Sequence, residues 1–297
     1  MRRPILLLAV FLVSTAGLFA HQALREATPL AIAAWRLGLA ALFFGGLSLL
    51  PRGEQNGPLS KNARWRLILA GLCLAAHFVT WFAALDRTSV ARATLLACTT
   101  PLWTTIGGFV LGRRRPTLRD MAALAVAGLG LWLVTQASAQ EATHATLLGD
   151  VFGLSAGLLF GSYLLCVEGL HETISSQRQV TLAYSVAAGL LWAALLVRGG
   201  ATLTYSPSVW KALLGMTLGP QIFGHTLLNW SLRHFHSSVV AFSILLEPII
   251  AALLAWYLLG QTLTLVQLFG GVLVLAALAL VIGQKTPAER VEAEAVG

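Results

Sequence analysis

Long apolar stretches separated by short polar segments fill almost all of this chain of 297 residues. A helix that crosses the hydrocarbon core of a bilayer needs about 20 apolar residues, and ten stretches meet that length. The alternating pattern of a lipid-facing barrel is missing, so the stretches predict helices. We place these helices at residues 4–22, 28–50, 65–85, 89–111, 118–136, 148–167, 179–197, 209–231, 238–259 and 264–283.

Two prolines lie at matching places inside the apolar stretches. Pro101 and Pro248 are 147 residues apart, the spacing that also separates Leu85 from Leu232. A proline removes an intrahelical hydrogen bond, and lipid offers no water to replace it, so we predict that both prolines are hinges. The spacing predicts a five-helix unit used twice, with the second unit inverted because five is odd. The units and a charged, disordered tail are expected at residues 4–136, 148–283 and 284–297.

The composition agrees with a multi-pass membrane protein and indicates its orientation. Hydrophobic residues make up 57% of the chain and charged residues 11%, against about 25% charged residues in soluble domains. With a cytoplasmic N-terminus, the inner segments hold fourteen of the twenty Lys and Arg residues, so both termini are expected inside. The net charge of +8 does not indicate nucleic-acid binding, because the sequence predicts no basic face outside the membrane zone. The N-terminal stretch also resembles a cleavable signal peptide, but we expect it to be retained as the first membrane helix.

The sequence lacks the residue patterns typical of disulfide-linked, metal-binding and enzymatic proteins. Cys73, Cys98 and Cys166 all fall inside predicted spans without CxxC spacing, so neither a disulfide framework nor a metal site is expected. The sequence contains no HExxH or GxxxxGK[ST] motif, and its one GxSxG match, Gly153-Leu-Ser-Ala-Gly157, lies inside a predicted apolar helix rather than at a strand-to-helix turn. We therefore expect no enzyme, no cofactor and no ATP-driven pump.

Several short motifs resemble the drug/metabolite transporter superfamily, in particular its ten-helix exporters built from two EamA-type repeats. They are Ala84–Ser89, Leu245-Leu-Glu-Pro248, and the Leu-Gly pairs at 111–112 and 259–260. The resemblance implies an all-helical inverted repeat with both termini inside, in an inner (cytoplasmic) membrane. It also implies a central cavity lined by helices one, three, four, six, eight and nine. Where the family has a glutamate after the Leu-Gly turn, this chain has Arg113 and Gln261, so that residue's role does not carry over.

The same resemblance implies efflux of small organic metabolites, such as amino acids, by alternating access. The alternative is a broad drug or toxic-cation exporter coupled to protons, in which Glu247 and aromatic walls recognise the solute. A membrane enzyme or a purely structural protein is disfavoured, because loops are short and polar groups lie at mid-membrane.

Two charged residues, Glu247 and Arg36, lie well inside predicted spans rather than near their ends. Glu247, next to Pro248, is either a proton-accepting or cation-pairing carboxylate or a hydrogen-bonded acid at the helix break. Arg36 could hold a substrate carboxylate or pair with Glu247. It lies about eight residues from the outer helix end, however, so we favour snorkelling toward the headgroups or backbone carbonyls.

Polar and aromatic residues complete the predicted substrate site. His77 and His225 lie at near-equivalent positions in the third and eighth predicted helices. They are either proton relays or donors and acceptors of hydrogen bonds between helices. Gln221, His225 and Asn229 recur every four residues, which favours one face lining a cavity. Aromatic walls could come from Trp81, Trp103, Tyr163 and Trp230, which suits amphipathic solutes.

Two further patterns predict structural roles. Gly153, Gly157 and Gly161 form a GxxxGxxxG line that favours close helix packing. The run Arg113-Arg114-Arg115 is interpreted as a topology signal rather than a ligand site.

Overall fold

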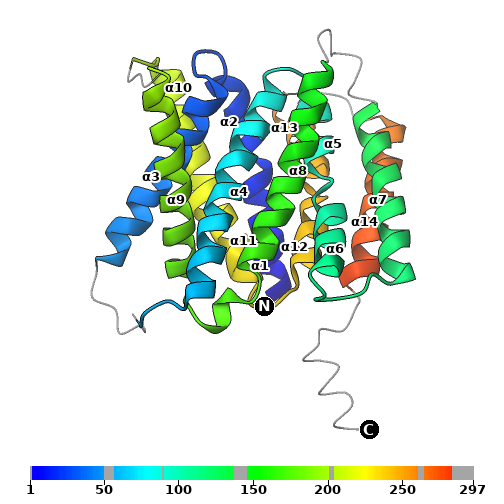
Figure 1. Ribbon diagram of the computed structural model, residues 1–297. Coiled ribbons are helices and arrows are strands. Elements are labelled where there is room, and N and C mark those ends of the chain that lie inside the picture. The colour runs from blue at the N-terminus through cyan, green and yellow to red at the C-terminus, as the bar shows by residue number, and fades with distance from the viewer. Residues whose placement is uncertain are drawn as a thin grey trace.

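A computed structural model describes residues 2–49, 57–88, 90–136, 146–200, 204–259 and 264–282, and in this part of the chain all regular structure is helical (Figure 1). The ranges predicted from the sequence all hold helices. The helices are α1 (Arg2–Ser14), α2 (Ala16–Ala23), α3 (Pro29–Ser48), α4 (Lys61–Leu85), α5 (Val90–Ala97), α6 (Thr100–Val110), α7 (Leu118–Gln136), α8 (Leu147–Val167), η2 (Leu170–Glu172), α9 (Ser176–Val197), α10 (Pro207–Met216), η3 (Thr217–His225), α11 (Thr226–Ser231), α12 (Ser237–Ile244), α13 (Glu247–Leu259) and α14 (Leu265–Ile282).

The two prolines that mark the repeat each lie just after a helix break. The break between α5 and α6 falls at Cys98–Thr99, and the break between α12 and α13 falls at Leu245–Leu246. Pro101 and Pro248 are each the second residue of the half-helix that follows, where a missing N–H leaves no hydrogen bond unmade. Both halves of the chain therefore interrupt the same helix at the same place.

The helix predicted at 209–231 has an irregular centre. Residues Thr217–His225 form a π-helix with Pro220 inside it, between the α-helical segments α10 and α11. Proline removes a donor and crowds the carbonyl four residues earlier, and a wider turn relieves that crowding. The π-helical turn also changes the directions of neighbouring side chains, so the four-residue spacing no longer defines one face.

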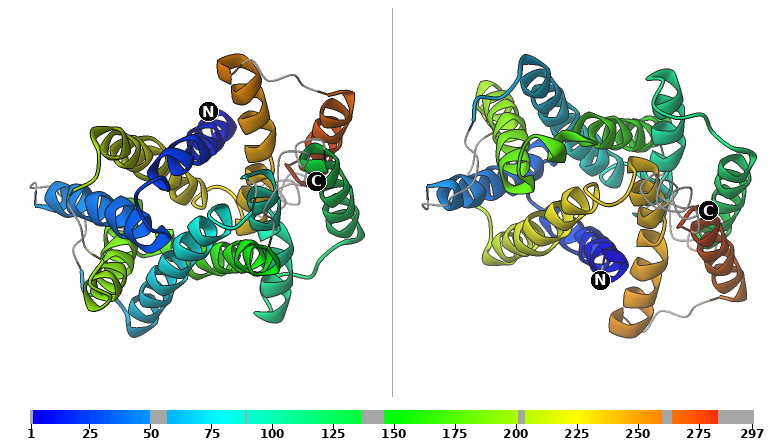
Figure 2. Two further views of the ribbon diagram at one scale, coloured as in Figure 1. Left: turned by 90° about the horizontal axis from the view of Figure 1, so that it is seen from above. Right: turned by 90° about the horizontal axis from the view of Figure 1, so that it is seen from below.

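Packing between the helices repeats along with the sequence. The first helix of each half packs against the third and fourth helices of the other half: α1 against η3, α11, α12 and α13, and α8 against α4, α5 and α6. Corresponding helices of the two halves also meet, α3 with α9 and α7 with α14. Figure 2 shows α7 and α14 side by side at one edge of the bundle, with α3 and α9 at the opposite edge.

The glycine line on α8, which predicted a close helix contact, packs directly against the break between α5 and α6. A Cβ on Gly157 would lie 2.5 Å from Thr99 Oγ1 and 2.9 Å from the Ala97 carbonyl oxygen. Similar close approaches occur at Gly153, 2.7 Å from Leu96 Cβ, and at Gly161, 3.0 Å from Trp103 Cβ. Glycine lets the two backbones approach where α5 ends.

The surface of the bundle is apolar, as expected for a multi-pass membrane protein. By length and composition, six helical segments of the described chain can cross a membrane, and two shorter apolar ones follow at Ser237–Ile250 and Leu265–Val281. Large apolar side chains such as Leu42 and Val110 face outward. The count of ten spans and the inside position of both termini stay predictions, and the tail at 284–297 lies outside the described residues.

Candidate functional site: a central cavity between broken helices

A cavity lies at the level of the helix breaks and has a volume of about 40 Å³, room for a few water molecules. Its lining comes from α1, α2, α4, α5, α6, α8, η3, α12 and α13, which are the helices expected from the resemblance, and also from α3. The lining residues are Val13, Ala16, Arg36, His77, Phe78, Trp81, Thr94, Ala97, Cys98, Thr100, Phe160, His225, Ile244 and Glu247.

Arg36 turns into the protein, so the expected snorkelling toward the headgroups is wrong. The side chain is 0% exposed, and its Nε donates a hydrogen bond to Gln221 Oε1 at 2.7 Å. Its guanidinium carbon lies 4.2 Å from the centre of the Phe78 ring. Nη1 and Nη2 are buried and have no hydrogen-bond partner among the residues that the structure describes. Because Arg36 is on the same face of α3 as the buried Ile32 and Ala33, the rotation of the helix directs it inward.

Glu247 brings the opposite charge into the same cavity. It is the first residue of α13, directly after the break, and neither a hydrogen bond nor an ion pair to it is present among the described residues. No ion pair joins it to Arg36, yet the two are close enough for their charges to interact. The cavity thus holds a cation and a carboxylate that do not neutralise each other by direct contact.

The two predicted histidines meet in the cavity, 148 residues apart in sequence. His77 Nδ1 lies 2.9 Å from the Ala156 carbonyl oxygen of α8, so the neutral ring donates from this atom. Both imidazoles pack against Phe160, at ring-centre distances of 4.8 Å for His77 and 5.4 Å for His225. Among the described residues, no group of three acidic, His or Cys side chains is placed to hold a metal ion.

The polar stripe predicted on one face splits into three environments. His225 lines the cavity, Gln221 contacts Arg36, and Asn229 lies outside the cavity lining. Asn229 Oδ1 accepts a hydrogen bond from Tyr163 Oη at 2.7 Å and one from Gln179 Nε2 at 3.3 Å. Gln221, Asn229 and Tyr163 thus connect helices behind the cavity wall.

The predicted aromatic walls are placed unevenly. Trp81 lines the cavity, but Trp103 does not, and its Nε1 instead donates to Thr99 Oγ1 at 3.1 Å within the α5–α6 break. Trp230 packs edge-to-face on His234. Two rings of the lining were not predicted: Phe78, which supports Arg36 on one side, and Phe160, which packs against both histidines. Substrate contact by His77, Trp81, His225 and Glu247 stays a prediction, as does a hinge role for Pro101 and Pro248.

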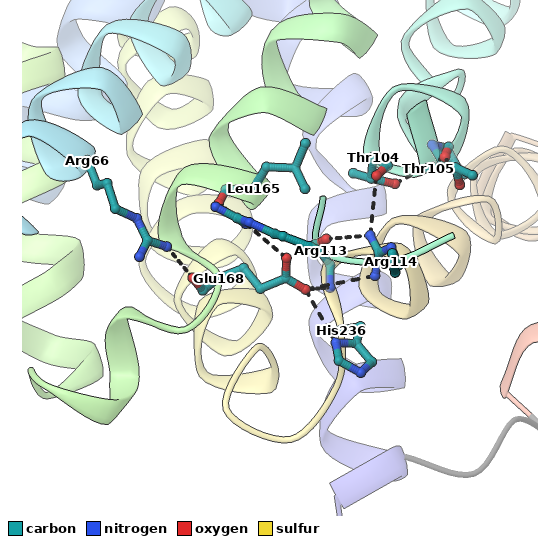
Figure 3. A network of polar contacts seen from close by, with 10 residues as sticks. Arg66, Thr104, Thr105, Arg113, Arg114, Leu165, Glu168 and His236 are labelled. Atoms are coloured by element: carbon teal, nitrogen blue, oxygen red, sulfur yellow. Dashed lines mark hydrogen bonds and ion pairs between the residues drawn. The ribbon is translucent and has the colours of Figure 1, made fainter. Parts of the chain in front are cut away.

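A second polar cluster, the Glu168 network, joins the two halves at the end of the bundle where α1 begins (Figure 3). Glu168 follows α8, and its carboxylate lies 3.2 Å from Arg113 Nη1 and 3.9 Å from Arg114 Nη1. It also accepts the Ser237 N–H at 2.8 Å and lies 3.6 Å from His236 Nδ1. Arg66 of α4 donates to the Glu168 carbonyl oxygen.

Arg113 and Arg114 therefore do more than set topology. Arg113 Nη1 donates to the Leu165 carbonyl oxygen at 2.7 Å, and Arg114 Nη2 donates to the Thr104 carbonyl oxygen at 3.2 Å and to Ser237 Oγ at 3.0 Å. The two arginines come from the first half of the chain, and Glu168 and Ser237 from the second. The sequence signal for this network was an acidic residue just beyond a predicted span, and it was overlooked.

Comparisons with known proteins agree with this architecture. The sequence profile of the EamA-like transporter family matches residues 4–136 and 147–283. An uncharacterized transporter of Archaeoglobus fulgidus is 26% identical over 284 residues, 93% of this chain and 96% of its own. The uncharacterized transporter YwfM of Bacillus subtilis is 25% identical, covering 97% of this chain and 95% of its own. One crystal structure superposes with a TM-score of 0.75 at 17% identity, covering 94% of this chain and 96% of its own, which shows a shared fold.

Proposed function

Because this chain belongs to the EamA-like transporter family, we propose that it is a secondary transporter that exports small organic metabolites, such as amino acids, by alternating access. The observation that carries this proposal is the central cavity between the helix breaks. It holds buried polar and charged groups that a purely structural core would pair with one another. At about 40 Å³ the cavity is smaller than small-molecule sites, about 300–1,000 Å³, so the proposal requires the helices around it to move apart when a solute binds.

Alternating access needs elements that bend and elements that hold one end closed. The α5–α6 and α12–α13 breaks supply two symmetry-related points where helix halves can change angle. The Glu168 network links the two halves at one end, which would be the cytoplasmic end with the predicted orientation. In this account, opening toward the cytoplasm breaks the Glu168 network, and opening to the other side leaves it intact.

The alternative, a proton-coupled exporter of toxic cations, rests on Glu247. Its carboxylate faces the cavity without a hydrogen bond or ion pair from any described residue, so it could exchange a proton for a cation. The buried positive charge of Arg36 in the same cavity opposes a cationic solute. We therefore favour solutes that are not purely cationic.

Flux into proteoliposomes tests the proposed function. Purified protein would be reconstituted and offered labelled amino acids, other small metabolites and a cationic dye, with and without a pH gradient. We expect saturable flux of at least one metabolite above that of protein-free vesicles. Flux of the dye alone, driven by the pH gradient and abolished in Glu247→Gln, would favour the alternative. Absence of flux for every solute would contradict both.

A further inference from the structure

Arg36 stands out because most of its hydrogen-bonding capacity is unused inside the protein. A guanidinium carries five N–H donors in a planar fork. One of them, on Nε, donates to Gln221 Oε1, and the four on Nη1 and Nη2 have no acceptor in the described part of the chain. The side chain is 0% exposed, and a buried charge normally finds partners for its remaining donors.

The geometry fixes the direction of the unused donors. Gln221 holds the Nε edge of the guanidinium, and the Phe78 ring lies 4.2 Å from its carbon, so two sides of the group are occupied. Arg36 lines the central cavity, and Nη1 and Nη2, which are buried and lack an acceptor among the described residues, are its donors left for a solute that enters when the cavity opens. Two parallel N–H groups on a planar fork match the two oxygens of a carboxylate.

Glu247 restricts which carboxylates fit. Its own carboxylate lies in the same cavity and would repel a solute with a net negative charge. A solute that carries a cationic group as well as a carboxylate satisfies both residues. The rings of Phe160 and Trp81 supply apolar wall for the rest of the molecule.

We propose that Arg36 is the residue that selects the substrate, by binding the carboxylate of a zwitterionic solute through Nη1 and Nη2, with Gln221 as its positioning residue. This inference rests on the proposed transport function and adds a substrate class and a named recognition contact to it. It is independent of the direction of transport and of the driving gradient.

Matched solutes test the proposal on the full-length protein. In proteoliposomes, counterflow would be measured with L-phenylalanine and L-leucine. Three analogues of each amino acid would then compete with it: the amide and the methyl ester, in which the carboxylate is masked, and the amine, in which it is removed. We expect the wild-type protein to prefer the carboxylate over each analogue by at least about 30-fold, the loss typical when a buried charge loses its partner. Equal competition by acid and ester would overturn the assignment.

Variants separate the guanidinium from a general need for charge. Arg36→Met should reduce the apparent affinity for the carboxylates by about 30-fold or more and remove the preference over the esters. Arg36→Lys keeps the charge but not the fork and should recover part of both. Arg25→Met, which removes an exposed positive charge before the same helix, is the matched control and should change neither.

The outcomes also distinguish this proposal from the one on which it rests. Unchanged carboxylate affinity in Arg36→Met would overturn the role of Arg36. If Arg36→Met does not fold, the acid-to-ester preference of the wild-type protein and the result for Arg36→Lys decide the question. Flux of esters, amines or dyes without preference for a carboxylate would leave a transporter and remove the Arg36 assignment. Absence of any flux would contradict the transport function itself.

Discussion

Arg36 Nε donates a hydrogen bond to Gln221 Oε1 at 2.7 Å, joining α3 to the π-helix η3 across 185 residues of sequence. The contact places a cation from the first half of the chain against a carbonyl oxygen from the second. Both side chains are 0% exposed, so water does not compete with the bond. The orientation of the guanidinium in the cavity therefore depends on one neutral partner.

Gln221→Leu is predicted to raise KM for a carboxylate solute and leave the maximal rate nearly unchanged. A hydrogen bond to a charged group contributes about 1.5–3 kcal/mol, so KM should rise about tenfold or more. Counterflow at varied solute concentration measures both constants. Gln179→Leu is the control, because Gln179 is also a buried amide but donates to Asn229 rather than contacting Arg36. Equal increases in KM in the two variants would show that Gln221 has no special role.

Gly157→Ala is predicted to destabilise the packing of α8 on the α5–α6 break. The added methyl group would lie 2.9 Å from the Ala97 carbonyl oxygen and 3.0 Å from that of Leu96, and backbone cannot move aside as a flexible side chain can. Overpacking of this kind lowers the free energy of unfolding by about 1–3 kcal/mol. Denaturant titration in mixed micelles measures it. Gly128→Ala, whose Cβ would meet no described atom within 4 Å beyond the backbone of its own helix, should show no such loss.

Glu168→Gln is predicted to favour opening at the end of the bundle that holds the Glu168 network. The variant removes the negative charge that attracts Arg113 and Arg114 and leaves the side chain's shape. A shift of about 1–2 kcal/mol would change the population of the open state about 5–30-fold. The measurement uses Ala97→Cys in a protein whose native cysteines have been replaced. More frequent opening should increase the rate at which a maleimide labels this cysteine from the cytoplasmic side.

The control for Glu168→Gln is Asp86→Asn. Asp86 Oδ2 pairs with Arg87 Nη1 at 3.0 Å, but the two residues are adjacent in sequence and partly exposed, so this ion pair does not itself join the two halves. Labelling should be unchanged in this variant. If Glu168→Gln also leaves the labelling rate unchanged, the network does not hold that end closed.

The loop after α2 should make stability depend on pH through Glu26. The hydroxyl and the N–H of Ser206 donate to this carboxylate, with Ser206 N 2.8 Å from Glu26 Oε2, and they hold the pKa of Glu26 below its ordinary value of 4.5. A carboxyl group with a lowered pKa in the folded state stabilises the fold above the unfolded pKa and stops doing so as pH falls through the folded pKa.

The corresponding measurement is the midpoint of thermal unfolding as pH is lowered from neutral through about 4.5 and below. The wild-type midpoint should fall more steeply in that range than the midpoint of Glu26→Gln, which cannot titrate. Parallel curves for the two proteins would show that the Ser206 contact does not contribute to stability.

Features that depend on local sequence were predictable. Apolar length located the helices, and Pro101 and Pro248 located the two breaks, because a proline acts on the turn in which it lies. The glycine line on α8 predicted a close helix contact for a similar reason. Pro220 carried the same kind of signal for the π-helix and was overlooked.

Features that depend on helix rotation were not predictable from one sequence. Arg36 lies near enough to a helix end to snorkel, and its inward direction is set by how α3 packs against η3 and α4. Likewise, Asn229 shares a predicted face with His225, but the π-helix separates their directions, and Tyr163 provides a partner from a distant helix. The direction of such a side chain depends on partners that are distant in the sequence.

The most direct test of the central claim, that solutes pass through the cavity between the broken helices, is a block at Ala97, which lines that cavity. Flux of a transported metabolite would be measured in proteoliposomes with Ala97→Cys in the cysteine-free protein, before and after complete reaction with a maleimide. We predict that labelling abolishes flux, that the metabolite slows labelling, and that the cysteine-free protein is unaffected by the reagent. Undiminished flux after complete labelling of this residue would contradict the account.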